Sequence, residues 1–73
     1  MPPMPIISGH DVIAALCRLG YREIRQRGSH VRLVCEYRSP LTVPLHAEIR
    51  RGTLRSILRT ADVSLADLLR LLK

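Results

Sequence analysis

A short run of the sequence holds four side chains that could together bind a phosphate and move a proton: Arg25, Arg27, His30 and Arg32. Between them, Gly28-Ser29 separates two runs in which apolar residues alternate, which predicts a two-residue β-turn with a positive φ angle at the glycine. In such a hairpin Arg27 lies opposite His30. Arg25 likewise lies opposite Arg32, and all four side chains project from one face because side chains alternate along a strand. The other, core-facing side is expected to carry Ile24, Gln26, Val31, Leu33 and Cys35.

The concentration of positive charge at this turn has two interpretations. Hairpins often carry arginines on their solvent side, and a histidine after a turn is usually only solvated. However, like charges on neighbouring strands destabilise a sheet, so three guanidinium groups beside an imidazole favour an anion as their partner. Phosphate fits best, because arginine presents it with a rigid fork of donors. Because glycine has no side chain, Gly28 would let such a partner approach the turn closely.

The composition describes one small, basic domain over residues 1–73. The chain has 12 lysine and arginine residues against 6 acidic residues, a formal net charge of +6. Its core must be built from Leu, Ile and Val, because the sequence has no Phe or Trp and only two Tyr. The excess of positive charge indicates a polyanion or an acidic partner. An arginine-rich surface typical of a GC-rich genome is the alternative.

The two cysteines form neither a disulfide framework nor a zinc motif. We expect both to be buried and reduced, Cys17 on a helix and Cys35 on a strand. The sequence shows no secretory or transmembrane segment, since no apolar run approaches the ~18 residues that a span requires. We therefore expect a cytoplasmic protein without a membrane partner.

Apolar spacing and capping residues predict an α+β fold. Ser8 and Gly20 bracket a first helix as its N-cap and its C-terminal glycine, and Ser64 caps a last helix. The expected order is α-β-β-β-α(α), with helices on one face of a three-stranded antiparallel sheet and the charged hairpin side chains on the open face. The predicted elements are an extended arm over 1–7, a helix over 9–19, strands over 21–27, 30–37 and 41–44, a turn at 38–40, a loop over 45–51, a helix over about 52–61 and a final helix after 64.

A second basic surface is predicted on the helix that follows the sheet. Arg51, Arg55 and Arg59 recur every fourth residue and therefore stack along one side of that helix. Like charges at this spacing destabilise an isolated helix slightly, and an external anion would relieve the repulsion. A solvated basic face explains the stripe equally well.

Three segments of the chain are similar to those of a known family. Their residues are Ser8-Gly9 with Leu19-Gly20-Tyr21, the run Arg25-Gln26-Arg27-Gly28-Ser29-His30, and Val43-Pro44-Leu45-His46 followed by Arg51-Gly52-Thr53-Leu54-Arg55-Ser56-Ile57-Leu58-Arg59. In order and spacing they resemble the HicA (YcfA-like) toxins of type II toxin–antitoxin pairs, from about residue 8 to 72. The main departure is Cys35, where the family leads us to expect an ordinary apolar or basic residue.

This resemblance implies a fold like that of double-stranded-RNA-binding domains. It implies the activity of an mRNA interferase, a ribonuclease that cleaves messages without a metal cofactor, with His30 as the catalytic histidine. It also implies a HicB-like antitoxin that covers the site and joins the toxin in repressing their operon, so that operator DNA is bound only through that complex. The residues expected to contact RNA are Arg25, Arg27, Gly28, Ser29, Arg32, Arg51, Arg55 and Arg59.

The residues themselves suggest a mechanism. RNA carries its own nucleophile, the 2′-hydroxyl beside each phosphate, so a metal-free ribonuclease needs a base and cations. His30 can be the general base, and the acid in a later step, because histidine titrates near neutral pH. Arg27 and Arg32 can stabilise charge in the transition state. His46 is the other candidate for protonating the leaving group, and a loop histidine without a role is the alternative.

Other classes of function are also compatible with the sequence. No metal or other cofactor is expected, because the carboxylates do not share one motif: Glu23, Glu36 and Glu48. The chain fits equally well a module that binds RNA without cutting it. It also fits an interaction subunit whose basic surface serves only to bind an acidic antitoxin.

Overall fold

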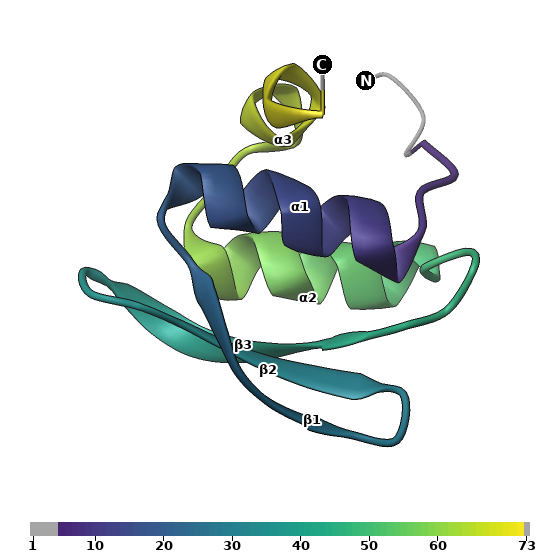
Figure 1. Cartoon of the computed structure of the whole chain (residues 1–73). Coiled ribbons are helices and arrows are strands. Elements are labelled where there is room, and N and C mark those ends of the chain that lie inside the picture. The colour runs from purple at the N-terminus through teal and green to yellow at the C-terminus, as the bar shows by residue number, and fades with distance from the viewer. Residues whose placement is uncertain (1–4, 73) are drawn as a thin grey trace.

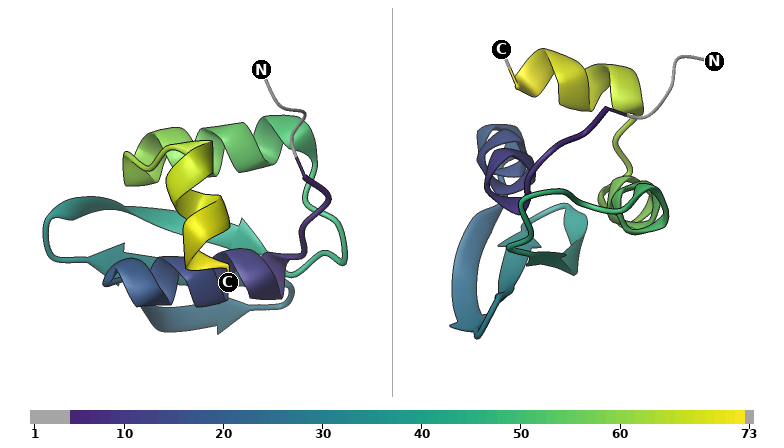
Figure 2. Two further views of the ribbon diagram at one scale, coloured as in Figure 1. Left: turned by 90° about the horizontal axis from the view of Figure 1, so that it is seen from above. Right: turned by 90° about the vertical axis from the view of Figure 1, so that its right-hand side faces the viewer.

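The computed structural model describes residues 5–72 as a three-stranded antiparallel sheet covered on one face by helices. The sheet order is β1-β2-β3. In Figures 1 and 2, α1 and α2 lie side by side above the sheet and α3 crosses over them, while the lower face of the sheet, here called the open face, carries no helix. The predicted α+β class and element order are confirmed. In chain order the elements are α1 Gly9–Leu19, β1 Arg22–Arg27, β2 His30–Cys35, β3 Arg38–Pro44, α2 Arg51–Ala61 and α3 Leu65–Leu71.

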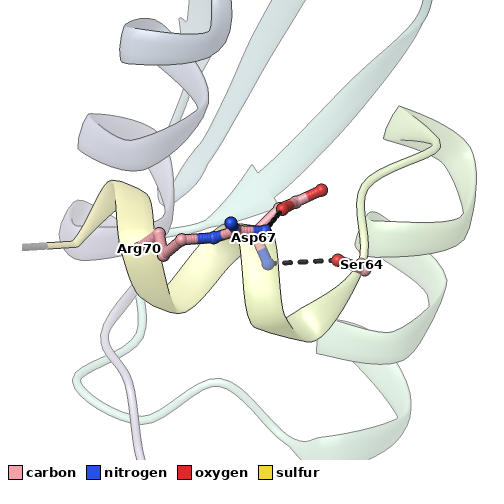
Figure 3. Close-up of polar contacts among 3 residues, drawn as sticks. All are labelled: Ser64, Asp67 and Arg70. Carbon is pink, nitrogen blue, oxygen red and sulfur yellow. Dashed lines mark hydrogen bonds and ion pairs between the residues drawn. The ribbon is translucent and has the colours of Figure 1, made fainter.

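The helix ends follow from local capping. The hydroxyl of Ser8 accepts a hydrogen bond from the backbone N–H of Asp11 at 3.1 Å, and α1 ends at Gly20, whose φ is 122°. At α3, the Ser64 hydroxyl accepts from the N–H of Asp67 at 3.0 Å, and the Asp67 carboxylate pairs with Arg70 (Figure 3). An unsatisfied N–H at a helix start is stabilised by such a side-chain oxygen, so these short motifs set the boundaries predicted from the sequence.

The core lies between the sheet and the helices and is aliphatic apart from one tyrosine. It is built from the apolar stripes of α1 and α2, the inward residues of β2 and β3, and Leu68 of α3. Its most deeply buried large side chains are Leu16, Leu33, Leu54, Leu68, Val12, Val31 and Val43. The predicted inward positions on β2 are confirmed for Val31 and Leu33, whereas Cys35 is half-buried.

Strand β1 does not alternate as predicted, because it contains a bulge at Ile24. Arg22 pairs with Val34 and Arg25 pairs with Arg32, so Ile24 is the extra residue between them. The prediction that Ile24 faces the core is therefore wrong, and its side chain is 51% exposed. A bulge inserts one unpaired residue and changes which side chains face each side.

Two residues near Ile24, one before and one after the bulge, differ in their burial. Tyr21 is 3% exposed and its hydroxyl donates to the carbonyl oxygen of Ser39 at 2.8 Å. Gln26 lies opposite the buried Val31 and so projects from the predicted side of the hairpin, but it is exposed there, and its amide donates to the carbonyl oxygen of Gly28 at 3.0 Å. The core face of the hairpin is thus supplied by β2 rather than by β1.

The turn between β2 and β3 lies earlier than predicted. The chain reverses at Glu36-Tyr37, and β3 begins at Arg38, so the predicted turn at 38–40 is wrong. Proline cannot donate to a sheet ladder, but β3 is an edge strand, where Pro40 is tolerated. The start of β3 is held by Arg38, which donates to the carbonyl oxygen of Ala61 at 2.5 Å.

Two further expectations concern the cysteines and the arm. Cys17 is exposed on α1, so the prediction that it is buried is wrong. Residues 1–4 of the predicted arm lie outside the described residues. Within the rest of the arm, Ile7 is 4% exposed, and its carbonyl oxygen accepts the N–H of Ile49 at 2.8 Å, which ties this segment to the loop before α2. Within residues 5–72, no helix has the length and apolar character needed to cross a membrane.

Candidate functional site

The open face carries a shallow basic pocket, which we define by its lining residues Arg25, Arg27, His30, Arg32 and Thr42. The predicted hairpin register is confirmed: Arg27 lies opposite His30, and Arg25 lies opposite Arg32. The first four lining residues are thus the four that the sequence placed on one face.

The geometry of this pocket follows from the tight turn between β1 and β2. Gly28 has a φ of +56°, the left-handed conformation that the turn requires, and space remains around its Cα. His30 is exposed immediately after the turn, and Arg32 is half-buried two residues further along β2. Arg32 donates from Nη1 to the hydroxyl of Thr42 at 3.1 Å, which orients this guanidinium group from β2 toward β3.

The positive charge of the pocket is not balanced by acidic side chains. None of its five lining residues is acidic, and three of them are arginines. Guanidinium groups remain charged at any physiological pH, so the pocket presents a concentrated positive potential to solvent. An anion with several oxygens, such as a phosphodiester, is the chemical partner for which this arrangement is suited.

Two open-face residues were not found by sequence reasoning. Thr42 enters the pocket from β3, where it lies opposite Arg32. Arg22 pairs with Val34, which follows the fully buried Leu33 on β2, so Arg22 and Val34 face the open side. The bulge that turns Arg22 outward has no reliable sequence signal. Thr42 could have been proposed only from a correct register of β3.

Three separate segments meet at the turn end of the sheet. The carbonyl oxygen of Ser29 accepts the N–H of Leu45 at 2.6 Å, and that of His46 accepts the N–H of Gly9 at 2.9 Å. In Figure 1 the β1–β2 turn, the start of α1 and the loop before α2 accordingly lie at the same end of the molecule. A Cβ atom on Gly9 would lie 2.0 Å from the carbonyl oxygen of Pro44, so only glycine permits this close approach. His46 is exposed there, but it does not line the basic pocket.

The arginines of α2 form a different surface. Arg51, Arg55 and Arg59 are all exposed, and we call them the α2 stripe. Their helix packs on the covered side of the sheet and contacts β3 most extensively, so the stripe belongs to the helical layer (Figure 1). The structure therefore does not bring the stripe together with the basic pocket. No acidic residue occurs within Arg51–Ala61 to neutralise it.

Within residues 5–72, no group of three or more histidine, cysteine, aspartate or glutamate side chains is arranged to hold a metal ion. The side chains that line the basic pocket supply one imidazole, three guanidinium groups and one hydroxyl. This set can bind a phosphate and transfer a proton, as the sequence suggested.

Comparisons with known proteins agree with this description. The family model described as "HicA toxin of bacterial toxin-antitoxin" matches residues 9–63, which include the basic pocket and the α2 stripe. A chain in a solved toxin–antitoxin complex from Streptococcus pneumoniae is similar to this one, with a TM-score of 0.67 and 27% sequence identity, over 84% of this chain and 100% of that chain. The search of curated proteins found no match. The extent of the family match shows that the chain belongs to the HicA toxin family of bacterial toxin–antitoxin systems.

Proposed function

We propose that this toxin is an endoribonuclease that cleaves mRNA in the cytoplasm without a metal cofactor, with His30 as its general base. The observation that carries the proposal is the exposed imidazole of His30 in a pocket whose other charged groups are all arginines. Family membership supports a toxic activity, and the pocket supports a chemistry directed at a phosphodiester.

The proposed reaction uses the nucleophile within the substrate. His30 removes the proton from a ribose 2′-hydroxyl, and the oxygen attacks the adjacent phosphorus. The bond from phosphorus to the 5′ oxygen of the next nucleotide then breaks, leaving a cyclic 2′,3′-phosphate, and the leaving 5′ oxygen takes up a proton to become a hydroxyl. Arg27 and Arg32 stabilise the negative charge on the phosphorane-like transition state. Proton transfer by one positioned side chain accelerates such steps by about 10²–10⁴-fold.

Substrate contacts extend beyond the reacting phosphate in this proposal. Arg25 and the Gly28-Ser29 turn contact the RNA strand next to the scissile bond, since they adjoin His30 on the same hairpin. The α2 stripe, formed by Arg51, Arg55 and Arg59, provides a second set of phosphate contacts on the helical layer. Because the two surfaces are separate, a longer RNA would gain more binding affinity from the α2 stripe than a short one.

A HicB-like antitoxin is the proposed partner. The open face is uncovered in the described chain, so a protein seated on it would block access of RNA to His30. Binding only to the folded toxin would also stabilise it by mass action. The structural neighbour from a toxin–antitoxin complex supports a partner of this kind. Operator DNA would be bound only by the toxin–antitoxin complex.

The test is RNA cleavage by the purified chain in EDTA. Wild-type protein is expected to degrade RNA, and the His30→Ala variant is expected to lose this activity by at least about 100-fold. DNA of the same sequence is the substrate control, because it lacks the 2′-hydroxyl and is expected to remain intact. His10→Ala, which removes an exposed histidine of α1, is the matched protein control and should cleave normally. RNA that stays intact with the wild-type chain would overturn the proposal.

A non-catalytic RNA-binding module is the second candidate, and the exposed α2 stripe outside the basic pocket favours it. Inhibition of growth by such a module would persist in the His30→Ala variant and would instead decrease with Arg55→Ala or Arg59→Ala. Induction of these variants in cells, compared with wild type at equal protein level, separates the two candidates. A subunit that only binds an acidic antitoxin would cleave no RNA even after the partner is removed.

A further inference from the structure

The ladder between β2 and β3 continues for one residue beyond the ends of both strands. His30 pairs with Pro44, and the next residues outward, Ser29 and Leu45, are joined by the N–H···O bond of 2.6 Å. This bond keeps the antiparallel register at the turn. His46 follows Leu45 and therefore takes the position diagonal to His30, beside the β1–β2 turn. Diagonal neighbours on adjacent antiparallel strands lie about 7–8 Å apart, within reach of long side chains.

Burial falls along this extension, from the end of β3 to His46. Val43 is buried in the core, and Leu45 is half-buried and packs against the same core. His46, the next residue, is exposed. Pro44, between Thr42 and His46, is buried as well, so it is the exposure of His46, at the point where the chain leaves β3 beside the turn, that places its imidazole at the surface. Two imidazoles thus flank the turn, one on each of two adjacent segments.

The main chain holds His46 in place without using its side chain. The N–H of Leu45 is bonded to Ser29, and the carbonyl oxygen of His46 is bonded to Gly9 in α1. None of these bonds involves the imidazole. The segments bonded to each other here carry these charged or titratable side chains: His10 in α1, Arg27 and His30 in the hairpin, and Glu48 and Arg50 in the loop that contains His46.

We infer that His46 is the general acid of the cleavage reaction, so that the site operates with a pair of histidines on the two sides of the turn. This inference rests on the proposed ribonuclease function and supplies the group that the basic pocket lacks. His30 takes the proton of the 2′-hydroxyl as the P–O2′ bond forms. His46, protonated, gives its proton to the 5′ oxygen as the P–O5′ bond breaks, and one proton is then exchanged with water to restore both groups.

Apart from His30, none of the residues that line the pocket is suited to act as the general acid. Guanidinium groups do not release a proton at physiological pH, and a threonine hydroxyl is a far weaker acid than an imidazolium. His10 is less suited than His46, because it belongs to α1 in the helical layer, whereas His46 continues the strand that carries Thr42.

The experiment compares two leaving groups. A chimeric RNA with a single scissile phosphodiester is made with either an ordinary 5′ oxygen or a bridging 5′ sulfur at that bond. A thiolate leaves without protonation, whereas an alkoxide requires an acid. His46→Ala is expected to lower kcat on the oxygen substrate by about 100-fold but to cleave the sulfur substrate within about threefold of the wild-type rate. His46→Gln, which keeps a polar side chain, should behave in the same way. His10→Ala is the matched control and should cleave both substrates normally.

Binding and folding are measured on the same variants. Affinity for a non-cleavable 2′-O-methyl RNA is expected to change by less than about threefold in His46→Ala, and its thermal unfolding should match that of wild type because only main-chain groups of His46 are bonded. Equal losses on the oxygen and sulfur substrates, a full rate on the oxygen substrate, or an affinity loss as large as the rate loss would each overturn the role of His46. Failure of the ribonuclease proposal has a different result: the wild-type chain would then leave the oxygen substrate intact.

Discussion

Arg32 and Thr42 lie opposite each other on β2 and β3, and the guanidinium Nη1 donates to the threonine hydroxyl at 3.1 Å. This bond limits the orientations of a charged side chain on the open face of the sheet. Thr42→Val keeps the shape and the β-branched side chain but removes the acceptor. Because a net hydrogen bond contributes about 1 kcal/mol, we expect RNA cleavage to fall about fivefold, measured as kcat/KM.

Thr42→Ser is the control for this prediction, since it restores the hydroxyl while losing the methyl group. It should cleave RNA at a rate close to that of wild type. Both variants should unfold within about 1 kcal/mol of the parent, because Thr42 is exposed. If the serine variant were as impaired as the valine variant, the hydroxyl would not be the group that matters.

Gly9 and Gly52 offer a matched test of close packing at the start of two helices. A Cβ atom on Gly9 would lie 2.0 Å from the Pro44 carbonyl oxygen, whereas one on Gly52 would meet nothing within 4 Å. We expect Gly9→Ala to lower the free energy of unfolding by at least about 2 kcal/mol, because neither backbone segment can move without breaking its hydrogen bonds. Gly52→Ala should raise it by about 0.5–1 kcal/mol. Urea unfolding followed by circular dichroism measures both, and equal stability of the two variants would contradict the packing described.

Arg38 joins the start of β3 to the end of α2. Its Nη1 donates to the carbonyl oxygens of Ala61 at 2.5 Å and Asp62 at 3.0 Å. A cation there satisfies backbone acceptors and opposes the negative end of the helix dipole. We expect Arg38→Ala to lower the free energy of unfolding by about 1–2 kcal/mol. Arg55→Ala removes an exposed arginine from the same helix and should change it by less than about 0.5 kcal/mol; similar losses in both variants would argue against a capping role.

We expect the phenol of Tyr21 to make the free energy of unfolding depend on pH in the alkaline range. Burial raises the pKa of its phenol above the usual range, Cys35 adds to this rise, and Arg38 opposes it. The folded state therefore holds the proton more tightly than the unfolded chain does. The resulting stability is fully present below the ordinary phenol range, about pH 10, and is lost as the pH rises through the folded pKa.

The free energy of unfolding, measured from about pH 9 to 11, is therefore expected to fall less steeply in Tyr21→Phe than in wild type. Near pH 7 the same variant should be about 1 kcal/mol less stable, because it loses the hydrogen bond to Ser39. Tyr37→Phe is the control, since Tyr37 is 90% exposed and should affect neither quantity. Parallel curves for wild type and Tyr21→Phe would show that Tyr21 is not the titrating group.

Local sequence was sufficient for the ends of α1, for the start of α3 and for the first hairpin. Ser8 and Ser64 cap their helices through bonds that span three residues, and the turn at Gly28-Ser29 pairs Arg27 with His30 as predicted. Such features depend on residues close together in the chain, so they are encoded in short motifs. The four charged side chains of the basic pocket follow from that one turn.

Contacts between segments far apart in the chain decided the features that short motifs could not predict. The bulge at Ile24 depends on how β1 fits beside β2 while Tyr21 enters the core, and the early start of β3 depends on Arg38 reaching the end of α2. The sequence by itself thus determined the element types, the caps and the hairpin that carries His30. Only the tertiary structure decided that Thr42 enters the pocket and that the α2 stripe lies on another layer, because those placements depend on packing between segments far apart in the chain.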